Sequence, residues 1–178
     1  PNNFNPPKED LDALIYLYKN GRLKDVLDKS EQMVLKHSNS IFLYNLRGSA
    51  YALLKKFDAA LECYKNALKV NPNYAAIYNN LGNVFKEIGE IELAKNNYEQ
   101  AINIKPNYAE AYYGLGLTLE KKGEFLSAIR NYENALINKP NYPEVFFNLG
   151  NVYRKSGDYE LAIKNYKNAI KLKKNYYE

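Results

Sequence analysis

One cysteine, Cys63, and one histidine, His37, are the side chains of this 178-residue chain best suited to nucleophilic, general-base or soft-metal chemistry. Single copies cannot build a disulfide framework or a metal site of cysteine and histidine ligands. His37 stands beside Ser38 in a polar stretch that we expect to end a helix, so no base is placed to activate a hydroxyl or a thiol. The sequence therefore predicts neither a metal nor a cofactor.

Short catalytic and phosphate-binding motifs are absent from the sequence. It contains no GxxxxGKS/T, GxGxxG, HExxH, GxSxG or CxxC pattern. Its close carboxylate pairs, Glu87 with Glu90 and Glu90 with Glu92, fall where helices are expected to end and turn, and hydrated charge is the simpler interpretation there. We therefore expect a protein that is not an enzyme.

The composition indicates a protein with a packed core. Hydrophobic residues make up 46% of the chain and charged residues 25%, which are ordinary globular values. No stretch approaches the roughly 18 consecutive apolar residues of a membrane helix, and the first residues, PNNFNPPKED, lack the features of a secretory signal. We expect a cytoplasmic protein with no membrane span. The sequence begins at Pro1 rather than Met, so a segment upstream of Pro1 stays an open alternative.

The net charge of the chain is +5, but it is not concentrated in one place. It divides as 0, +3, −1, 0 and +3 over residues 1–40, 41–74, 75–108, 109–142 and 143–178. Proteins that bind nucleic acid gather positive charge into a patch or a stripe. The distribution therefore argues against nucleic acid as a partner.

A 34-residue period organises the elements that would position any site. The tetrapeptides NPNY, KPNY, KPNY and KKNY recur at that spacing, at residues 71–74, 105–108, 139–142 and 173–176. One register matches the next two at 15 and 16 of its 34 positions. Five registers follow, at residues 7–40, 41–74, 75–108, 109–142 and 143–176. The sequence predicts an array of five equivalent units.

Each unit is expected to form two helices joined by a turn. Numbered from 1 within a unit, apolar or small residues fall at positions 4, 7, 8 and 11, as at Tyr78, Leu81, Gly82 and Phe85. This spacing marks one helix face, which we expect to be buried. Gly or Lys at position 15 interrupts the pattern, a second stripe follows at 20, 24 and 27, and proline at 32 ends the second helix. Gly at 8 and Ala at 20 and 27 are expected where helices approach closely.

With these residues the chain resembles the tetratricopeptide repeat family over residues 41–176. The matching positions in one unit are Leu115, Gly116, Ala128, Tyr132, Ala135 and Pro140. The resemblance implies an all-α, right-handed superhelical solenoid of five helix-turn-helix repeats, a single solenoid over residues 1–178, whose first helices line a concave groove. Tyrosines at positions 4, 24 and 34 are then explained by packing between helices rather than by stacking on nucleic acid.

The first register, residues 7–40, departs from this pattern. It carries Leu14 at position 8, Val26 at 20, Ser30 at 24 and Met33 at 27, and Ser38 replaces the proline at 32. A terminal repeat has a neighbour on one side only, so a divergent end unit is expected there.

The first helices should present a second face, opposite the stripe at positions 4, 7, 8 and 11. A rotation of about 100° per residue points positions 2, 6, 9 and 13 to that side, flanked by 5 and 12. We expect these positions to contact a ligand in the groove. The candidate residues are Asn45, Asn79, Asn80, Asn83, Lys86, Tyr113, Leu117, Lys121, Phe147, Asn148, Asn151 and Arg154.

Asparagine is frequent among the candidates. Its side chain offers a donor and an acceptor together, which matches one peptide unit of an extended ligand. The pattern is similar to the asparagine ladder of O-linked N-acetylglucosamine transferases, although Leu46, Gly114 and Leu117 interrupt it. The clamp of the chaperone-tail-binding members is absent, because position 5 carries no lysine. The residues expected either to anchor ligand side chains or to pack on a neighbouring unit are Phe42, Leu46, Tyr113 and Phe147.

The sequence favours a scaffold that binds a peptide or an extended segment of a partner protein in its concave groove. Two alternatives stay open. The chain stops at positions 1 and 2 of a sixth unit, with Tyr177 and Glu178, which would suit the substrate-recruiting arm of a larger glycosyl- or sulfotransferase-like enzyme. Exposed ends of the array, including Ile163 and Ile170 in the last helix, would suit assembly into a homo-oligomer.

Overall fold

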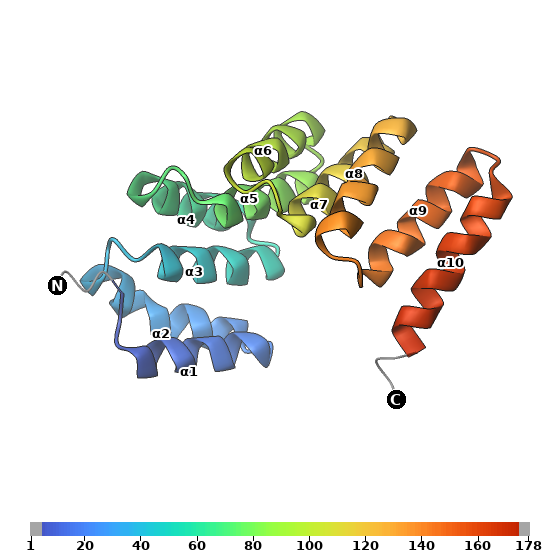
Figure 1. Ribbon diagram of the computed structural model, residues 1–178. Helices are drawn as coiled ribbons and strands as arrows, with labels where there is room; N and C mark the ends of the chain where they lie inside the picture. The colour runs from blue at the N-terminus through green and yellow to red at the C-terminus, as the bar shows by residue number, and fades with distance from the viewer. Residues whose placement is uncertain (1–4, 175–178) are drawn as a thin grey trace. The chain divides into compact units, whose positions relative to one another are not determined.

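The structure is a computed structural model that describes residues 5–174. Within this range the chain forms ten α-helices and no strand, which confirms the all-α helical repeat fold (Figure 1). The helices are α1 Lys8–Lys19, α2 Leu23–Lys36, α3 Ile41–Leu53, α4 Phe57–Val70, α5 Ala75–Ile88, α6 Ile91–Ile104, α7 Ala109–Lys121, α8 Phe125–Asn138, α9 Pro143–Lys155 and α10 Tyr159–Lys174. Each register contributes two consecutive helices, and the divergent register 7–40 also forms a pair.

The helices fall into two compact units, Pro1–Ile88 with α1 to α5 and Gly89–Glu178 with α6 to α10. The division runs between the two helices of the register 75–108. Each unit has its own packed interior. A single right-handed solenoid through all five registers stays a prediction.

Glycine and proline set the helix ends as the sequence indicates. The turn inside a pair needs a left-handed residue at position 15, where Gly21, Gly123 and Gly157 have φ angles of 70°, 81° and 82°. Lys55 takes the same conformation, with φ of 57°, at a position where its Cβ makes it less favourable than glycine. The second helices α4, α6 and α8 each end two residues before the proline at position 32.

Burial of the first helices differs from the expected stripe. Leucine at position 7 and glycine at 8 are buried as expected, but the aromatic side chains at position 4 are only partly buried. In α3, α5, α7 and α9 the residues at positions 3 and 10, which are not in the expected stripe, are instead almost completely buried. They are Leu43, Ala50, Ile77, Val84, Ala111, Thr118, Val145 and Val152. A first helix contacts more than its own second helix, since Ile77 and Val84 of α5 share a cluster with Ala60 and Ala67 of the preceding α4.

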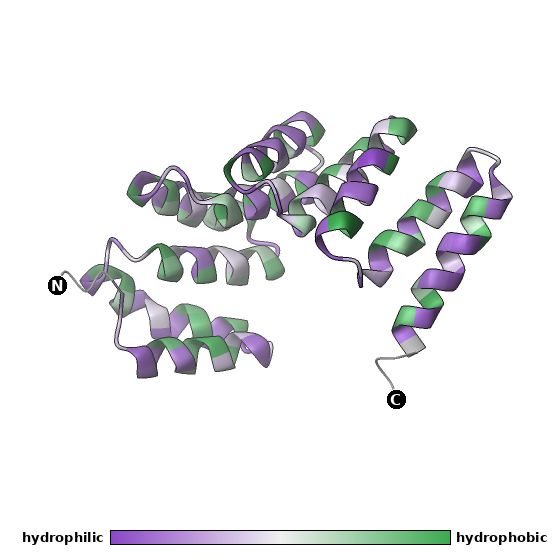
Figure 2. Cartoon of the chain, in the orientation of Figure 1, coloured by the Kyte–Doolittle hydropathy of each residue, from purple (hydrophilic) through white to green (hydrophobic). Residues whose placement is uncertain are grey.

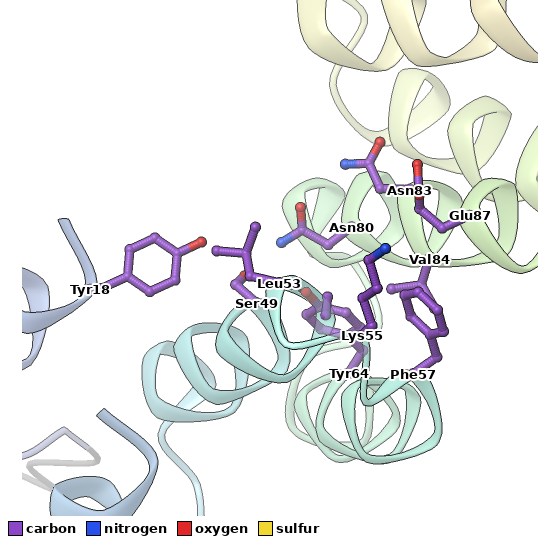
Figure 3. Close-up of a pocket in the computed structure, with 11 residues that line it drawn as sticks. Tyr18, Ser49, Leu53, Lys55, Phe57, Tyr64, Asn80, Asn83, Val84 and Glu87 are labelled. Atoms are coloured by element: carbon purple, nitrogen blue, oxygen red, sulfur yellow. Dashed lines mark hydrogen bonds between the residues drawn. The ribbon is translucent and has the colours of Figure 1, made fainter. Parts of the chain in front are cut away.

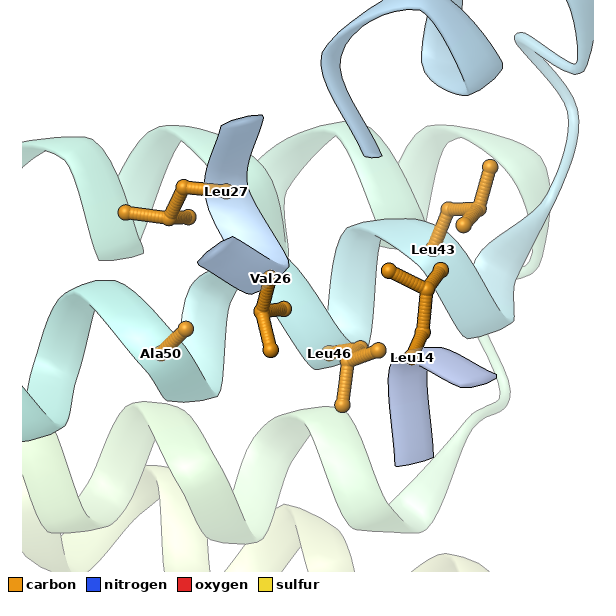
Figure 4. Packing of buried hydrophobic residues seen from close by; sticks show 6 residues of the cluster. All are labelled: Leu14, Val26, Leu27, Leu43, Leu46 and Ala50. Carbon is orange, nitrogen blue, oxygen red and sulfur yellow. The ribbon is translucent and has the colours of Figure 1, made fainter. Parts of the chain in front are cut away.

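The interior at the start of the chain joins α1, α2 and α3. Its buried side chains are Leu14, Val26, Leu27, Leu43, Leu46 and Ala50 (Figure 4). Of the two roles expected for Leu46, the structure shows packing rather than ligand anchoring, because its side chain is part of this core. Position 6 lies only about 40° around the helix from the buried position 10, so an apolar residue there is drawn inward.

Glycine at position 8 makes room for the tyrosine at position 24 of the same pair. A Cβ atom added to the glycine would lie about 2.5 Å from a tyrosine ring carbon in the pairs Gly48 with Tyr64, Gly116 with Tyr132 and Gly150 with Tyr166. The expected close approach of the two helices is thus confirmed. The first pair reverses the sizes, with Leu14 at position 8 and Ser30 at position 24, both fully buried.

Hydrophobic residues recur at helical spacing along the helices and alternate with hydrophilic ones (Figure 2). Each helix therefore has one face for packing and another for water. Among the helices of the described range, none is both long and apolar enough to cross a membrane.

Candidate peptide-binding groove

A pocket opens on the unit Pro1–Ile88, between side chains of α1, α3, α4 and α5 (Figure 3). Its volume is about 360 Å³. Apolar lining comes from Leu53, Phe57 and Val84, while Asn80 and Glu87 supply an amide and a carboxylate. Further polar and charged groups line it, from Tyr18, Ser49, Lys55, Tyr64 and Asn83, so the pocket joins an apolar surface to several hydrogen-bonding groups. We call it the groove pocket.

Two of the candidate asparagines meet beside the groove pocket. Asn80 Nδ2 on α5 donates a hydrogen bond of 2.8 Å to Asn45 Oδ1 on α3. Asn79 Nδ2 lies 3.5 Å from Asn80 Oδ1. An amide group has two N–H donors and two acceptor lone pairs, so these contacts leave Asn80 one donor and one lone pair for a ligand.

Asn45 and Asn80 are 35 residues apart, one repeat plus one residue, and stand at positions 5 and 6 of their repeats. We call a side-chain contact between neighbouring first helices at this separation a lateral bond. Helical geometry predicts each asparagine as a ligand contact and says nothing of a bond between them. The structure shows instead that one lateral bond fixes the orientation of both amides.

Asn79 is the candidate that the structure removes from the groove face. Its side chain is buried, with 7% of the residue exposed, and its Oδ1 atom has no hydrogen-bond partner in the described part of the protein. The expectation that it faces an open groove is therefore wrong. Position 5 lies about 60° around the helix from the buried position 8, at the edge of the open face, so burial there is decided by the neighbours.

Asn83 and Lys86 are the remaining candidates within Pro1–Ile88. Asn83 is exposed and lines the groove pocket, whereas Lys86 is half-buried on the same helix. Both side chains already interact with other groups of the protein. The structure thus brings Asn80 and Asn83 to one pocket and places Asn45 directly behind Asn80.

A chain of hydrogen bonds links four side chains in the unit Gly89–Glu178. Asn148 Nδ2 donates to Tyr113 Oη at 2.9 Å, which is a second lateral bond between positions 5 and 6. Asn151 Nδ2 lies 3.4 Å from Asn148 Oδ1, and Tyr166 Oη donates to Asn151 Oδ1 at 2.8 Å. Burial raises the pKa of Tyr113, which keeps its phenol neutral and able to accept from Asn148. Three of the predicted residues therefore act as one network.

Glu120 forms the next polar centre along α7. Its side chain is only 13% exposed, and its carboxylate accepts hydrogen bonds from Tyr132 Oη at 2.9 Å and Lys155 Nζ at 2.7 Å. Glu120 and Lys155 are again 35 residues apart, at positions 12 and 13. Burial, together with the negative charge of Glu120, raises the pKa of Tyr132, so its hydroxyl remains a donor.

The other candidates of this unit surround the network. Leu117 is half-buried, and Lys121 and Arg154 are exposed. Phe147 is 53% exposed, and its ring centroid lies 5.8 Å from that of Tyr166. Phe147 thus contacts the hydrogen-bonded chain through the ring of Tyr166.

Tyrosine hydroxyls are the groups that the sequence argument missed. It assigned position 24 wholly to packing, yet Tyr64 Oη lies 3.3 Å from Ser49 Oγ, and Tyr132 and Tyr166 reach Glu120 and Asn151. The rings of Tyr64 and Tyr132 are buried and that of Tyr166 is partly buried, while the three hydroxyls reach position 9 or 12 of the first helix. A tyrosine rather than a phenylalanine at position 24 was the available signal.

The interruption of the asparagine pattern at Gly114 has a steric cause. A Cβ atom on Gly114 would lie 2.4 Å from a ring carbon of Tyr98. Position 6 of this repeat therefore has no space for an amide side chain. Packing against Tyr98 therefore explains why this repeat has glycine rather than asparagine at position 6.

The described residues contain no group of three or more His, Cys, Asp and Glu side chains that could hold a metal ion. Cys63 is half-buried, and burial raises the pKa of its thiol, partly offset by the positive charge of Arg47. A raised pKa keeps the sulfur protonated and less nucleophilic. This environment suits a packed thiol.

Two family models match the sequence. One, described as TPR repeat, matches residues 48–89, 82–123 and 121–157. The other, described as Tetratricopeptide repeat, matches residues 143–176. No curated protein matches the chain.

Several solved structures share the fold. MamA of Desulfovibrio magneticus is 21% identical, with 94% of this chain and 95% of that chain covered and a TM-score of 0.78. PilF of Pseudomonas aeruginosa is 18% identical, with 92% and 74% covered and a TM-score of 0.85. YrrB, described as a TPR protein with an unusual peptide-binding site, is 19% identical, with 94% and 86% covered and a TM-score of 0.68.

Proposed function

The chain belongs to the tetratricopeptide repeat family, and from this premise we propose that its groove pocket binds an extended peptide segment of a partner protein. The repeats and the fold neighbours support a scaffold for protein–protein interaction. The peptide is the finer part of the proposal. The neighbour YrrB, with its peptide-binding site, supports a ligand of this class.

The observation that carries the proposal is the oriented amide of Asn80. Its lateral bond to Asn45 fixes the amide plane, so the remaining donor and acceptor do not lose rotational freedom when a ligand binds. A backbone peptide unit presents one N–H and one C=O, which is the complement of that remaining pair. Leu53, Phe57 and Val84 in the same pocket provide apolar surface for one ligand side chain.

The second unit, Gly89–Glu178, presents a polar surface of its own. Its network of Tyr113, Asn148, Asn151 and Tyr166 is already bonded internally, so a ligand contacts an ordered polar surface and does not reorganise loose side chains. Charges stand mostly at the edge of this surface, as Lys121 and Arg154 do. We expect the amides to set affinity and these charges to tune the rate of association.

Selection from a random peptide library, followed by titration of a labelled selected peptide, tests the proposal. Asn80→Ala should weaken binding by about 2- to 13-fold for each hydrogen bond that its amide makes to the peptide, and Asn80→Ala with Asn148→Ala should weaken it by roughly five-fold to over a hundred-fold. Asn66→Ala is the matched control, because Asn66 accepts from Lys69 on α4, outside the groove pocket.

Two results would contradict the proposal. Affinity that falls steeply with salt and does not respond to the asparagine variants would show that the groove selects ligands by charge. Failure of any peptide to bind the folded protein would move the interaction surface away from the first helices. Thermal melts of each variant show whether a loss of binding reflects a loss of folding.

A further inference from the structure

Two opposite charges line the groove pocket, the ammonium group of Lys55 and the carboxylate of Glu87. Both residues are exposed. Figure 3 shows the Lys55 side chain extending from the turn after α3 toward α5, the helix that carries Glu87. Within the described part of the chain neither side chain forms a hydrogen bond or an ion pair, with the other or with any further residue. The pocket therefore presents one unpaired cation and one unpaired anion.

Lys55 occupies a backbone conformation that favours glycine. Its φ angle is 57°, and the other four repeats have glycine at this position 15, with φ between 70° and 89°. A Cβ atom added to any of those glycines would meet nothing within 4 Å, so packing neither requires nor forbids a side chain there. The backbone cost of a residue other than glycine is thus not offset by packing. Strain of this kind is typical of positions where the side chain binds a ligand.

Glu87 lacks the partner that its position has in the last repeat. It stands at position 13, where Lys155 Nζ of α9 forms a lateral bond of 2.7 Å to the carboxylate of Glu120 at position 12 of α7. The corresponding position 12 beside Glu87 is Ala52, which lines the same pocket. A methyl group can neither neutralise nor hydrogen-bond the carboxylate. The charge of Glu87 is therefore left for a group from outside the chain.

We propose that the groove pocket prefers peptides that carry an acidic side chain for Lys55 and a basic side chain for Glu87, next to an apolar side chain that covers the apolar lining. This inference rests on the proposed function, because it concerns the ligand of the same pocket. The amide of Asn80 faces a backbone unit that every peptide has. The two charges then determine which peptide sequences bind.

The pair of charges excludes as well as attracts. A run of acidic residues would bring a carboxylate against Glu87, and a run of basic residues would bring an ammonium group against Lys55. Like charges in contact at an interface oppose binding. A bound peptide also displaces water from the pocket, which strengthens both attraction and repulsion. The preferred ligand is therefore a segment of mixed charge.

A charge exchange tests the proposal. Peptides are selected from a random library on the 178-residue protein, and one selected peptide is labelled and titrated beside a version in which its acidic and basic residues are exchanged. The exchanged version should bind about ten-fold more weakly, since two attractions become two repulsions. The protein variant Lys55→Glu with Glu87→Lys, whose net charge is unchanged, should reverse this preference. Lys56→Glu with Glu62→Lys is the matched control, because both residues are exposed and lie outside the pocket lining.

The variant Lys55→Gly separates binding from folding. It removes the ammonium group and gives the turn the residue that its backbone conformation favours. The selected peptide should bind about two- to five-fold more weakly, while the variant unfolds at the same temperature as the native protein or at a higher one. Unchanged affinity together with a lower melting temperature would assign Lys55 to the fold and overturn the proposal.

The remaining outcomes distinguish this inference from the proposed function. Failure of any peptide to bind would overturn both. Peptides that bind and respond to Asn80→Ala, but show no pairing of acidic with basic residues, would overturn only the preference for mixed charge. Equal binding of the original and exchanged peptides, or a preference that the exchanged protein variant does not reverse, would overturn it too. Circular dichroism melts of both double variants check that each is folded.

Discussion

The first helical pair and the later pairs fill the same space in opposite ways. In the fourth pair Gly116 lies against Tyr132, and a Cβ atom on the glycine would come within 2.5 Å of the ring. In the first pair Leu14 and Ser30 occupy the corresponding positions, and both are fully buried. The combined volume at the contact is the requirement, and neither residue type is required by itself.

The exchange of sizes has a polar consequence. Ser30 in the first pair places its Oγ atom inside, where Arg47 Nη1 donates to it and to the Leu27 carbonyl, both at 2.8 Å. The tyrosines of later pairs instead extend a hydroxyl to the groove side, as Tyr132 does to Glu120. The first pair is thus attached to its neighbour through an arginine, and it contributes no position-24 hydroxyl to the groove.

The largest expected effect tests the first side of this comparison. Leu14→Ala should lower the free energy of unfolding by about 2–5 kcal/mol, since a fully buried leucine leaves a cavity that Ser30 is too small to fill. Urea denaturation measures the loss. Leu35→Ala, at an exposed leucine of α2, is the control. A loss below 1 kcal/mol for Leu14→Ala would show that α1 is not packed as described.

A pH titration tests the tyrosine side. Burial raises the pKa of Tyr64 from 10.0 to about 12, partly offset by its contact with Ser49. Because the folded pKa exceeds the unfolded one, this contribution to stability is complete below pH 10 and is lost between pH 10 and 12. A shift of that size corresponds to about 2–3 kcal/mol. Tyr64→Phe should flatten the alkaline fall in unfolding free energy, and Tyr16→Phe, at an exposed tyrosine, should leave it unchanged.

Placing the leucine and serine of the first pair at positions 8 and 24 of the fourth pair tests the comparison further. Gly116→Leu should cost about 1–3 kcal/mol by overpacking against Tyr132. Adding Tyr132→Ser recreates the leucine and serine of the first pair, so the double variant should be more stable than Tyr132→Ser alone. Thermal and urea unfolding of the three variants form a double-mutant cycle. Additive effects would mean that the two positions do not share one space.

The smallest effect concerns how neighbouring pairs are tied together. Lys155→Met removes the ion pair between Lys155 and Glu120. The lysine side chain of this pair is about half exposed. The expected loss is about 0.2–1 kcal/mol, and it should shrink as salt rises. Unfolding at low and high ionic strength measures it. A loss that is large and independent of salt would show that this pair is shielded from water, as the bonds of Arg47 to Ser30 and Leu27 are.

Much of the fold is visible in the sequence because its signals are local. The 34-residue period, the glycine at the turn, the proline after the second helix and the contact between positions 8 and 24 all follow from residues within one repeat. Burial at positions 3 and 10 is not visible in the sequence, because neither position keeps one residue type from repeat to repeat. At position 3 the residues are Leu43, Ile77, Ala111 and Val145. Their common feature is a neighbouring pair, which the periodicity of one helix does not show.

Only part of the arrangement at the candidate site follows from the sequence, because the geometry of one helix does not show what packs against it. Asn80, Asn83, Asn148 and Asn151 were assigned to the groove side from helical geometry alone. That geometry could not show that Asn79 is buried, since residues at the edge of a face are covered or exposed according to what packs beside them. The lateral bonds join residues 35 apart, and that offset depends on how two first helices pack together.

The lateral bonds also make adjacent repeats complementary rather than interchangeable. The fourth repeat offers Tyr113 and Glu120, and the fifth supplies Asn148 and Lys155. A gene duplication that placed the fifth repeat behind a copy of itself would set an amide against a phenyl ring and a lysine against an arginine. A tandem copy of the fourth would leave the phenol opposite a glycine. Such duplications would lose the lateral bonds at the new junction unless the side chains there changed as well.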